Sequence, residues 1–244
     1  MLNTYLLQTQ ELLQNPPAPN PLYATANLID YINRARLILA GDAECVRVYG
    51  QFSTVVGQRQ YPFSALNVAT VNPAVSAPFN LRYLWYAVGD PGGQASMRPR
   101  GWPWFSQYKL NNPVPQPGAP QVWSQYGQGD SGSLFIDPIP DDVYTIFCDT
   151  VCVPIALVDD TTAEAIPYPW TDAVPFFAAY YALLSAQAPA RQADAERMMQ
   201  RYEEFKTRAR RMSNPSILPG LYEQSAPVVS KANQLGAQSS GGGG

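Results

Sequence analysis

The strongest constraint on the fold is a change of hydrophobic period in the middle of the chain. Near both ends apolar residues recur every three or four positions, as in helices, whereas a central stretch of roughly 110 residues mostly alternates in steps of two. Such a chain is neither all-helical nor all-β. The pattern predicts an α+β protein in which N-terminal and C-terminal helices form one bundle and an antiparallel β-sandwich or barrel-like domain is inserted between them.

Composition divides the chain into four parts. Residues 1–43 supply the first helices, 44–168 the β-rich domain, 169–212 the helices that complete the bundle, and 213–244 an extended C-terminal arm. The arm is rich in Pro, Ser, Gln and Gly and ends in four glycines, a composition that cannot build a core alone.

The helical signals differ in strength. A short amphipathic helix is expected over 3–14, and a second helix is expected to begin at Thr25 as N-cap and stop at Gly41, with Asp30 and Arg34 forming an i,i+4 ion pair. After Pro169 the run FFAAYYALLSAQ is apolar on almost all sides, which predicts a buried helix.

The last helix is expected over 190–212, with a Glu204–Arg208 ion pair. Its apolar stripe comprises Ala195, Met198, Tyr202, Phe205, Ala209 and Met212. The same helix carries a cluster of basic residues that we regard as candidates for facing a DNA channel, a neighbouring subunit or solvent: Arg197, Arg201, Arg208, Arg210 and Arg211.

Strand patterns fall at about 45–56, 79–88, 121–126, 133–136 and 143–153. Both faces of the last run are apolar, so it should be a central strand. A short helix with Pro103 at its first position is expected over 102–110.

The chain contains no histidine, which excludes Ser-His-Asp and Cys-His catalysis and every His-based metal site. Cys148 and Cys152 lie four residues apart in a strand, so roughly 13 Å separates them and no disulfide should join them. Together with Cys45 they are predicted to be buried thiols.

Charge and hydropathy argue against two classes of partner, nucleic acid bound by bulk charge and membranes. Charged residues make up 14% of the chain and the net charge is −3, so bulk electrostatic binding to nucleic acid is disfavoured. There is no apolar run long enough for a membrane span and no basic N-terminal region typical of a signal peptide, so we expect synthesis in the cytoplasm and no membrane partner.

Three local patterns resemble functional sites. Gly129-Asp130-Ser131-Gly132 resembles a protease nucleophile loop, but without histidine it is interpreted as a turn. The pairs Asp141-Asp142 and Asp159-Asp160 suit turns or caps, although these carboxylates, with Asp137 and Glu164 as further candidates, keep glycoside hydrolysis open. A third reading is a carbohydrate-binding β module with a stacking platform of tryptophans, namely Trp85, Trp102, Trp104 and Trp123.

The order of several segments resembles the head-to-tail adaptor proteins of short-tailed bacteriophages. The segments are LIDYINRA (28–35), GAPQVW (118–123), LFIDPIPDDVY (134–144), VPIALVDD (153–160), IP (166–167), WTDA (170–173) and AAY (178–180). The similarity spans about residues 22–212.

This resemblance implies a structural virion protein with no enzymatic activity and no cofactor or metal. Because a few relatives degrade the cell wall, a peptidoglycan-degrading carboxylate hydrolase is kept as the alternative. Family members form a ring, usually of twelve copies, under the portal; the ring extends the DNA channel and docks the tail nozzle or other tail proteins, and contact with the genome is non-specific. The helices would face the portal, and the β part the tail. The C-terminal arm would bind the portal through spaced apolar residues: Ile217, Leu218, Leu221, Tyr222, Val228 and Val229.

Overall fold

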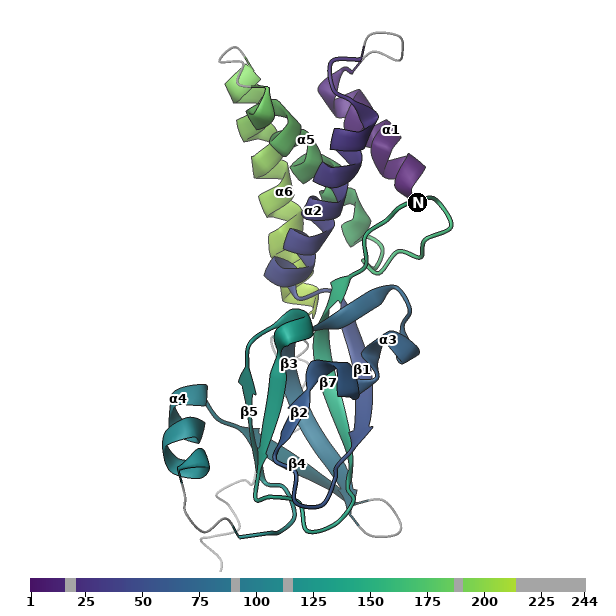
Figure 1. Ribbon diagram of the computed structural model, residues 1–244. Coiled ribbons are helices and arrows are strands. Elements are labelled where there is room, and N and C mark those ends of the chain that lie inside the picture. Colours follow the sequence, from purple (N-terminus) through teal and green to yellow (C-terminus); the bar gives the residue numbers. More distant parts are fainter. Residues whose placement is uncertain (16–20, 89–92, 112–115, 187–190, 214–244) are drawn as a thin grey trace, which may run out of the picture.

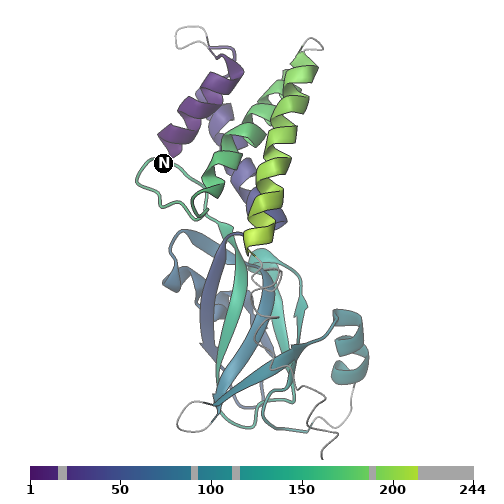
Figure 2. The ribbon, with the colours of Figure 1, turned by 180° about the vertical axis from the view of Figure 1, so that it is seen from behind.

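The computed structural model describes residues 1–15, 21–88, 93–111, 116–186 and 191–213 (Figure 1). It is an α+β protein with long helices at one end and a curled sheet at the other (Figures 1 and 2). The predicted arm, 213–244, lies outside the described residues apart from Ser213, which ends the last helix. All the strands fall between the second and fifth helices along the chain.

The four long helices begin and end close to the predicted positions. The bounds of the α-helices are α1 Leu2–Leu13, α2 Thr25–Ala43, α3 Val68–Val71, α4 Trp102–Phe105, α5 Ala173–Ser185 and α6 Gln192–Ser213. α3 was not predicted, and the helix expected over 102–110 is an α-helix to Phe105 followed by a π-helix over Ser106–Leu110. α5 contacts α1, α2 and α6. Its almost wholly apolar sequence is explained by this central place, since eight of its residues are buried.

Seven strands form one mixed sheet. They are β1 Arg47–Ser53, β2 Gln60–Pro62, β3 Val75–Val88, β4 Gly93–Pro99, β5 Val122–Tyr126, β6 Ser133–Asp137 and β7 Thr145–Pro154. Their order across the sheet is β1-β7-β3-β4-β5-β6-β2. β7 lies between β1 and β3, which confirms the prediction of a central strand. The sheet is not wholly antiparallel as predicted, because β4 and β5 pair in parallel.

Several local predictions were wrong. Thr25 is the first residue of α2 and makes no side-chain cap, and the helix runs through Gly41 to Ala43, where Glu44 takes the left-handed conformation. Arg34 stacks on the ring of Tyr181, with 4.4 Å from guanidinium carbon to ring centroid, and forms no ion pair with Asp30 in the part of the chain described. The favourable cation–π contact replaces the predicted pair.

The α6 predictions also need correction. Glu204 pairs with Arg201 one turn before it, at 3.0 Å, rather than with Arg208. Ala195, Tyr202 and Ala209 of the predicted stripe are buried, but Met212, in the last turn of the helix, is 64% exposed.

Replacing Gly41 with alanine should stabilise the chain by about 0.5 kcal/mol, because glycine inside a helix costs roughly that amount or more relative to alanine. A methyl group at this position would lie no closer than 3.6 Å to the Phe79 ring, an ordinary contact. Gly57 is the matched control: its φ of +79° makes Gly57→Ala destabilising even though the site is open. Urea denaturation followed by circular dichroism measures both changes, and a loss of stability in Gly41→Ala would contradict the prediction.

Candidate functional site

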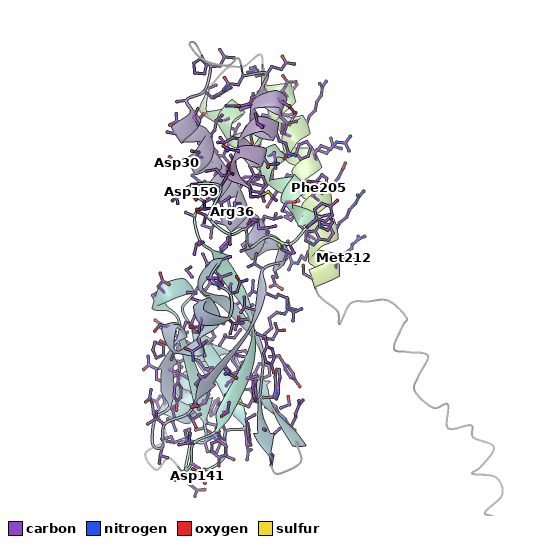
Figure 3. All side chains as sticks on the ribbon, turned by 90° about the vertical axis from the view of Figure 1, so that its right-hand side faces the viewer. Asp30, Arg36, Asp141, Asp159, Phe205 and Met212 are labelled. Carbon is purple, nitrogen blue, oxygen red and sulfur yellow. The ribbon has the colours of Figure 1, made fainter. Side chains whose placement is uncertain are left out.

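An apolar groove lies in the helical end of the molecule, between α1, α5 and α6. It has a volume of about 500 Å³. The rings of Phe176 and Phe205 stack within it, with centroids 5.8 Å apart and planes 20° apart. Phe205 reaches the groove because it belongs to the apolar stripe of α6 (Figure 3). The lining residues are Gln8, Glu11, Leu12, Asp172, Pro175, Phe176 and Phe205.

The candidate basic residues lie on the outer side of α6. Arg197 and Arg201 pair with acidic residues three positions away, Arg197 with Asp194 at 3.6 Å and Arg201 with Glu204 at 3.0 Å. Both arginines also line a smaller hollow beside Phe176. All five candidates are exposed: Arg197, Arg201, Arg208, Arg210 and Arg211. These exposed arginines can contact a charged partner or solvent, and no described part of the chain buries them.

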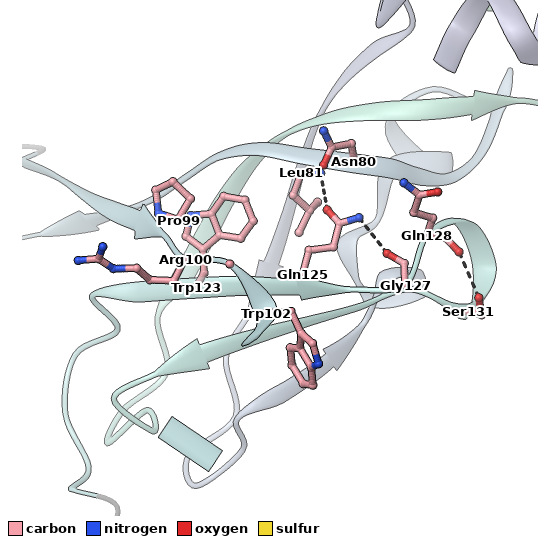
Figure 4. A pocket seen from close by; sticks show the side chains of 11 residues that line it. Asn80, Leu81, Pro99, Arg100, Trp102, Trp123, Gln125, Gly127, Gln128 and Ser131 are labelled. Atoms are coloured by element: carbon pink, nitrogen blue, oxygen red, sulfur yellow. Dashed lines mark hydrogen bonds between the residues drawn. The ribbon is translucent and has the colours of Figure 1, made fainter. Parts of the chain in front are cut away.

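A second hollow, of about 840 Å³, opens on the sheet between β3, β5 and the start of α4 (Figure 4). Gln125 bridges its wall: its side chain accepts a bond from Leu81 N–H at 2.9 Å and donates to the Gly127 carbonyl at 2.9 Å. The Trp123 indole N–H is buried and has no partner within the described chain. The ring of Trp102 points away from Gln125 (Figure 4) and packs on Tyr126 and Phe135.

The four candidate tryptophans do not stack into one platform. Trp85 contacts Tyr49 and Phe147, and Trp104 contacts Tyr108. Only Trp102 and Trp123 line the same hollow, and no ring contact joins any two of the four within the residues that the structure covers.

The candidate carboxylates serve as structural partners. Asp137 is 7% exposed and lies between two cations, 3.1 Å from Arg59 Nη2 and 2.8 Å from Lys109 Nζ. Glu164 accepts hydrogen bonds from Arg36 Nη2 at 2.8 Å and from Arg36 Nε at 2.9 Å. The two acids lie in different parts of the molecule, Asp137 on β6 and Glu164 against α2.

The acidic pairs were predicted to act in turns or caps: Asp141, Asp142 and Asp159 bond within their own loops, and Asp160 bonds to the start of α1. Asp159 accepts bonds from the hydroxyls of Thr161 and Thr162, which lowers its pKa, and Asp160 accepts the backbone N–H of Asn3 at 2.9 Å, which lowers its pKa likewise. The Tyr144 hydroxyl donates a hydrogen bond to Asp141 at 2.7 Å, and this bond raises the pKa of Tyr144 to about 12. Asp141 lies at the end of the sheet remote from the helices (Figure 3).

The remaining motifs have structural explanations. Gly129–Ser131 is a single helical turn between β5 and β6, which confirms the turn interpretation. All three cysteines are buried free thiols, as predicted. In the part of the chain that is described, no cluster of three or more cysteine or acidic side chains is placed to hold a metal ion. None of the described helices is long and apolar enough to span a membrane.

Burial of the thiols predicts a loss of stability in alkali. Burial raises the pKa of Cys45 and Cys148 to about 12 and that of Cys152 to about 11, because the thiolate loses its hydration. An unfolded thiol has a pKa of about 8.5, so the folded state binds more protons above that pH and its stability falls as pH rises toward 11–12.

The measurement is the free energy of unfolding in urea at several pH values between 7 and 10.5. Cys148→Ala should lower stability at pH 7 through a small cavity, yet should show a slope above pH 8.5 that is shallower by up to about 1.4 kcal/mol per pH unit. Buried tyrosines, whose pKa values are also raised, keep some slope in both chains. Equal slopes in the two proteins would contradict the assignment to Cys148.

The comparisons with known proteins leave these surfaces without an assigned role. No family model matches the chain, and no curated protein matches it significantly.

Proposed function

We propose that the chain is a structural protein of a tailed-bacteriophage virion, a head-to-tail adaptor that forms a ring, of twelve copies in the usual form, beneath the portal. In this role it extends the DNA channel at the portal vertex and provides the surface on which the tail docks. Its finer architecture is then a helical bundle, closed by the two ends of the chain, with an inserted β domain that faces the tail.

The observation that supports the proposal is that the two ends of one elongated subunit are built differently, which offers two unlike surfaces to two partners. The helices and their apolar groove lie at one end, and the sheet with its loops lies at the other (Figures 1 and 2). A protein that joins two unlike partners needs two such surfaces. In a ring of identical copies each contact is heterologous and closes by rotation.

The surface chemistry of the helical end supports contact with protein and with a DNA channel. The groove presents Leu12, Phe176 and Phe205, which are partly buried and apolar. Aromatic residues of this kind are enriched in interfaces. The exposed arginines of α6 supply a local positive surface on a chain whose net charge is −3, which suits weak contact with a genome that passes through the ring.

The arm is long enough to reach a portal above the helices. It leaves from Ser213 at the sheet end of α6, near Met212 (Figure 3). α6 holds 22 residues and therefore spans about 33 Å. Residues 214–244 can extend over about 100 Å at roughly 3.3 Å per residue, so the arm can run back along the helices and beyond them.

The carboxylate-hydrolase alternative gains no comparable support. Asp137 is already neutralised by the partly exposed Arg59 and Lys109, and Glu164 by the buried Arg36. Glu164 also accepts the backbone N–H of Ile166 at 2.8 Å. Asp137 on β6 and Glu164 against α2 lie in different parts of the molecule, so these two acids do not form the neighbouring pair of carboxylates that glycoside hydrolysis requires.

Binding to the portal tests the arm. A chain ending at Met212 should keep the helical and sheet circular dichroism of the full chain, because it retains all the described strands and all but the last residue of the described helices. It should bind portal rings from the same virus at least about tenfold more weakly, a loss of about 1.4 kcal/mol. A chain ending at Leu235, which removes only the small and polar tip, is the control and should bind normally. Unchanged binding by the shorter chain would refute the arm assignment.

A further inference from the structure

Four aromatic rings form one continuous patch on the outer face of the sheet. Tyr49 on β1, Phe147 on β7, and Tyr83 and Trp85 on β3 point to the same side, because each alternates with a buried neighbour. The ring centroids of Trp85 lie 4.9 Å from Tyr49, 5.6 Å from Phe147 and 5.8 Å from Tyr83. We call these four residues the aromatic face.

Among the described residues, nothing fully covers the aromatic face, and Trp85 and Phe147 are half-buried in it. Tyr49 and Tyr83 are each 48% exposed, and β7 and β3 face the viewer below the end of α6 in Figure 2. The charges beside it are already neutralised, since Arg47 pairs with Asp149 and Arg82 pairs with Glu44. An exposed, contiguous aromatic patch with a neutral border marks a place where something apolar and uncharged binds.

The last described helix of the chain ends beside the aromatic face. Arg47, two residues before Tyr49 on the same side of β1, donates from Nη1 to the carbonyl oxygen of Ser213 at 2.8 Å. Ser213 is the last residue of α6, so residue 214 begins beside the aromatic face.

The length and composition of the next nine residues fit the patch. Arg47 pairs with Val151, and Phe147 lies four residues earlier in β7, about 13 Å from Val151. Four extended residues after Ser213 cover the same distance, which is long enough for Ile217 to reach Phe147 and Trp85. The segment 214–222, NPSILPGLY, contains no charged residue and has two prolines. Extended proline-containing segments dock on surfaces lined by aromatic rings because their shape is set before binding.

We propose that residues 214–222 of the same chain cover the aromatic face in the isolated subunit, with Ile217, Leu218, Leu221 and Tyr222 as the contacting side chains. The proposal concerns the free chain and does not depend on the function proposed above. If a portal does take up the arm, these contacts are the ones it must replace.

Hydroxyl-radical footprinting with mass spectrometry tests the proposal on the isolated protein. Modification of Tyr49 and Tyr83 should increase severalfold when the chain ends at Ser213, whereas Tyr168, which is 83% exposed, should react equally in both chains. Ile217→Ser with Leu218→Ser should reproduce the increase in the full-length chain. Val228→Ser with Val229→Ser, the matched control beyond the segment, should not.

Equal modification of Tyr49 and Tyr83 in all four chains would overturn the proposal. So would protection that disappears on dilution, because a second copy would then be the cover. If the shortened chain fails to fold, the two full-length double variants still give the comparison. None of these readouts involves a portal, so failure here is distinct from failure of the adaptor function.

Discussion

Replacing Glu164 with alanine should lower the free energy of unfolding by about 3–5 kcal/mol, the effect typical of breaking a buried ion pair. Arg36 is 1% exposed, and its guanidinium bonds to Glu164 and to the carbonyl of Ile155, the latter at 2.7 Å. Without the carboxylate a buried positive charge is left uncompensated. The pair also ties the segment between β7 and α5 to α2, so it fixes how the helices meet the sheet.

Urea denaturation of the purified variants measures the effect. Glu203→Ala is the matched control, because Glu203 pairs with Lys206 near the surface of α6 and such pairs contribute about 0–1 kcal/mol. A double variant, Arg36→Met with Glu164→Leu, should recover much of the lost stability, since it removes both buried charges. Equal costs for Glu164→Ala and Glu203→Ala would show that the buried pair has no special role.

Replacing Gly50 with alanine should cost about 1–3 kcal/mol or more, because the site has no room for a methyl group. The added carbon would lie 2.7 Å from the carbonyl oxygen of Leu66 and 3.0 Å from the Cys148 sulfur. The first of these atoms belongs to the backbone, so the clash is relieved only by moving β1 away from the turn that packs on it.

Gly101→Ala is the control for Gly50→Ala. Gly101 has an ordinary φ of −62°, and its nearest neighbour to an added methyl group is Pro103 Cδ at 3.9 Å. Its thermal midpoint should therefore change little, whereas that of Gly50→Ala should fall by several degrees. Similar midpoints for the two variants would mean that β1 adapts at little cost.

Elements with a strong local signal could be predicted from the sequence. The apolar run of α5 and the two-sided apolar pattern of β7 correctly indicated a buried helix and a central strand. β4 was missed because only Met97 is buried among its seven residues, so it shows no alternation. β2 was missed because it has only three residues.

The surfaces could not be predicted because they depend on distant parts of the chain. Arg36 and Glu164 are 128 positions apart, and no local pattern indicates that they meet. The outward direction of Tyr49, Tyr83 and Trp85 follows from strand alternation, but whether that side is covered depends on where the helices pack. The groove at Phe176 and Phe205 likewise exists only once α1, α5 and α6 are in place.

The most direct test of the adaptor proposal is electron microscopy of portal rings from the same virus, with and without the purified full-length chain. The proposal predicts an additional ring of density beneath the portal, with the rotational symmetry of that portal, the helical ends of the subunits against it and the sheet ends pointing away. Portal rings that look the same with and without a saturating amount of the chain would contradict it.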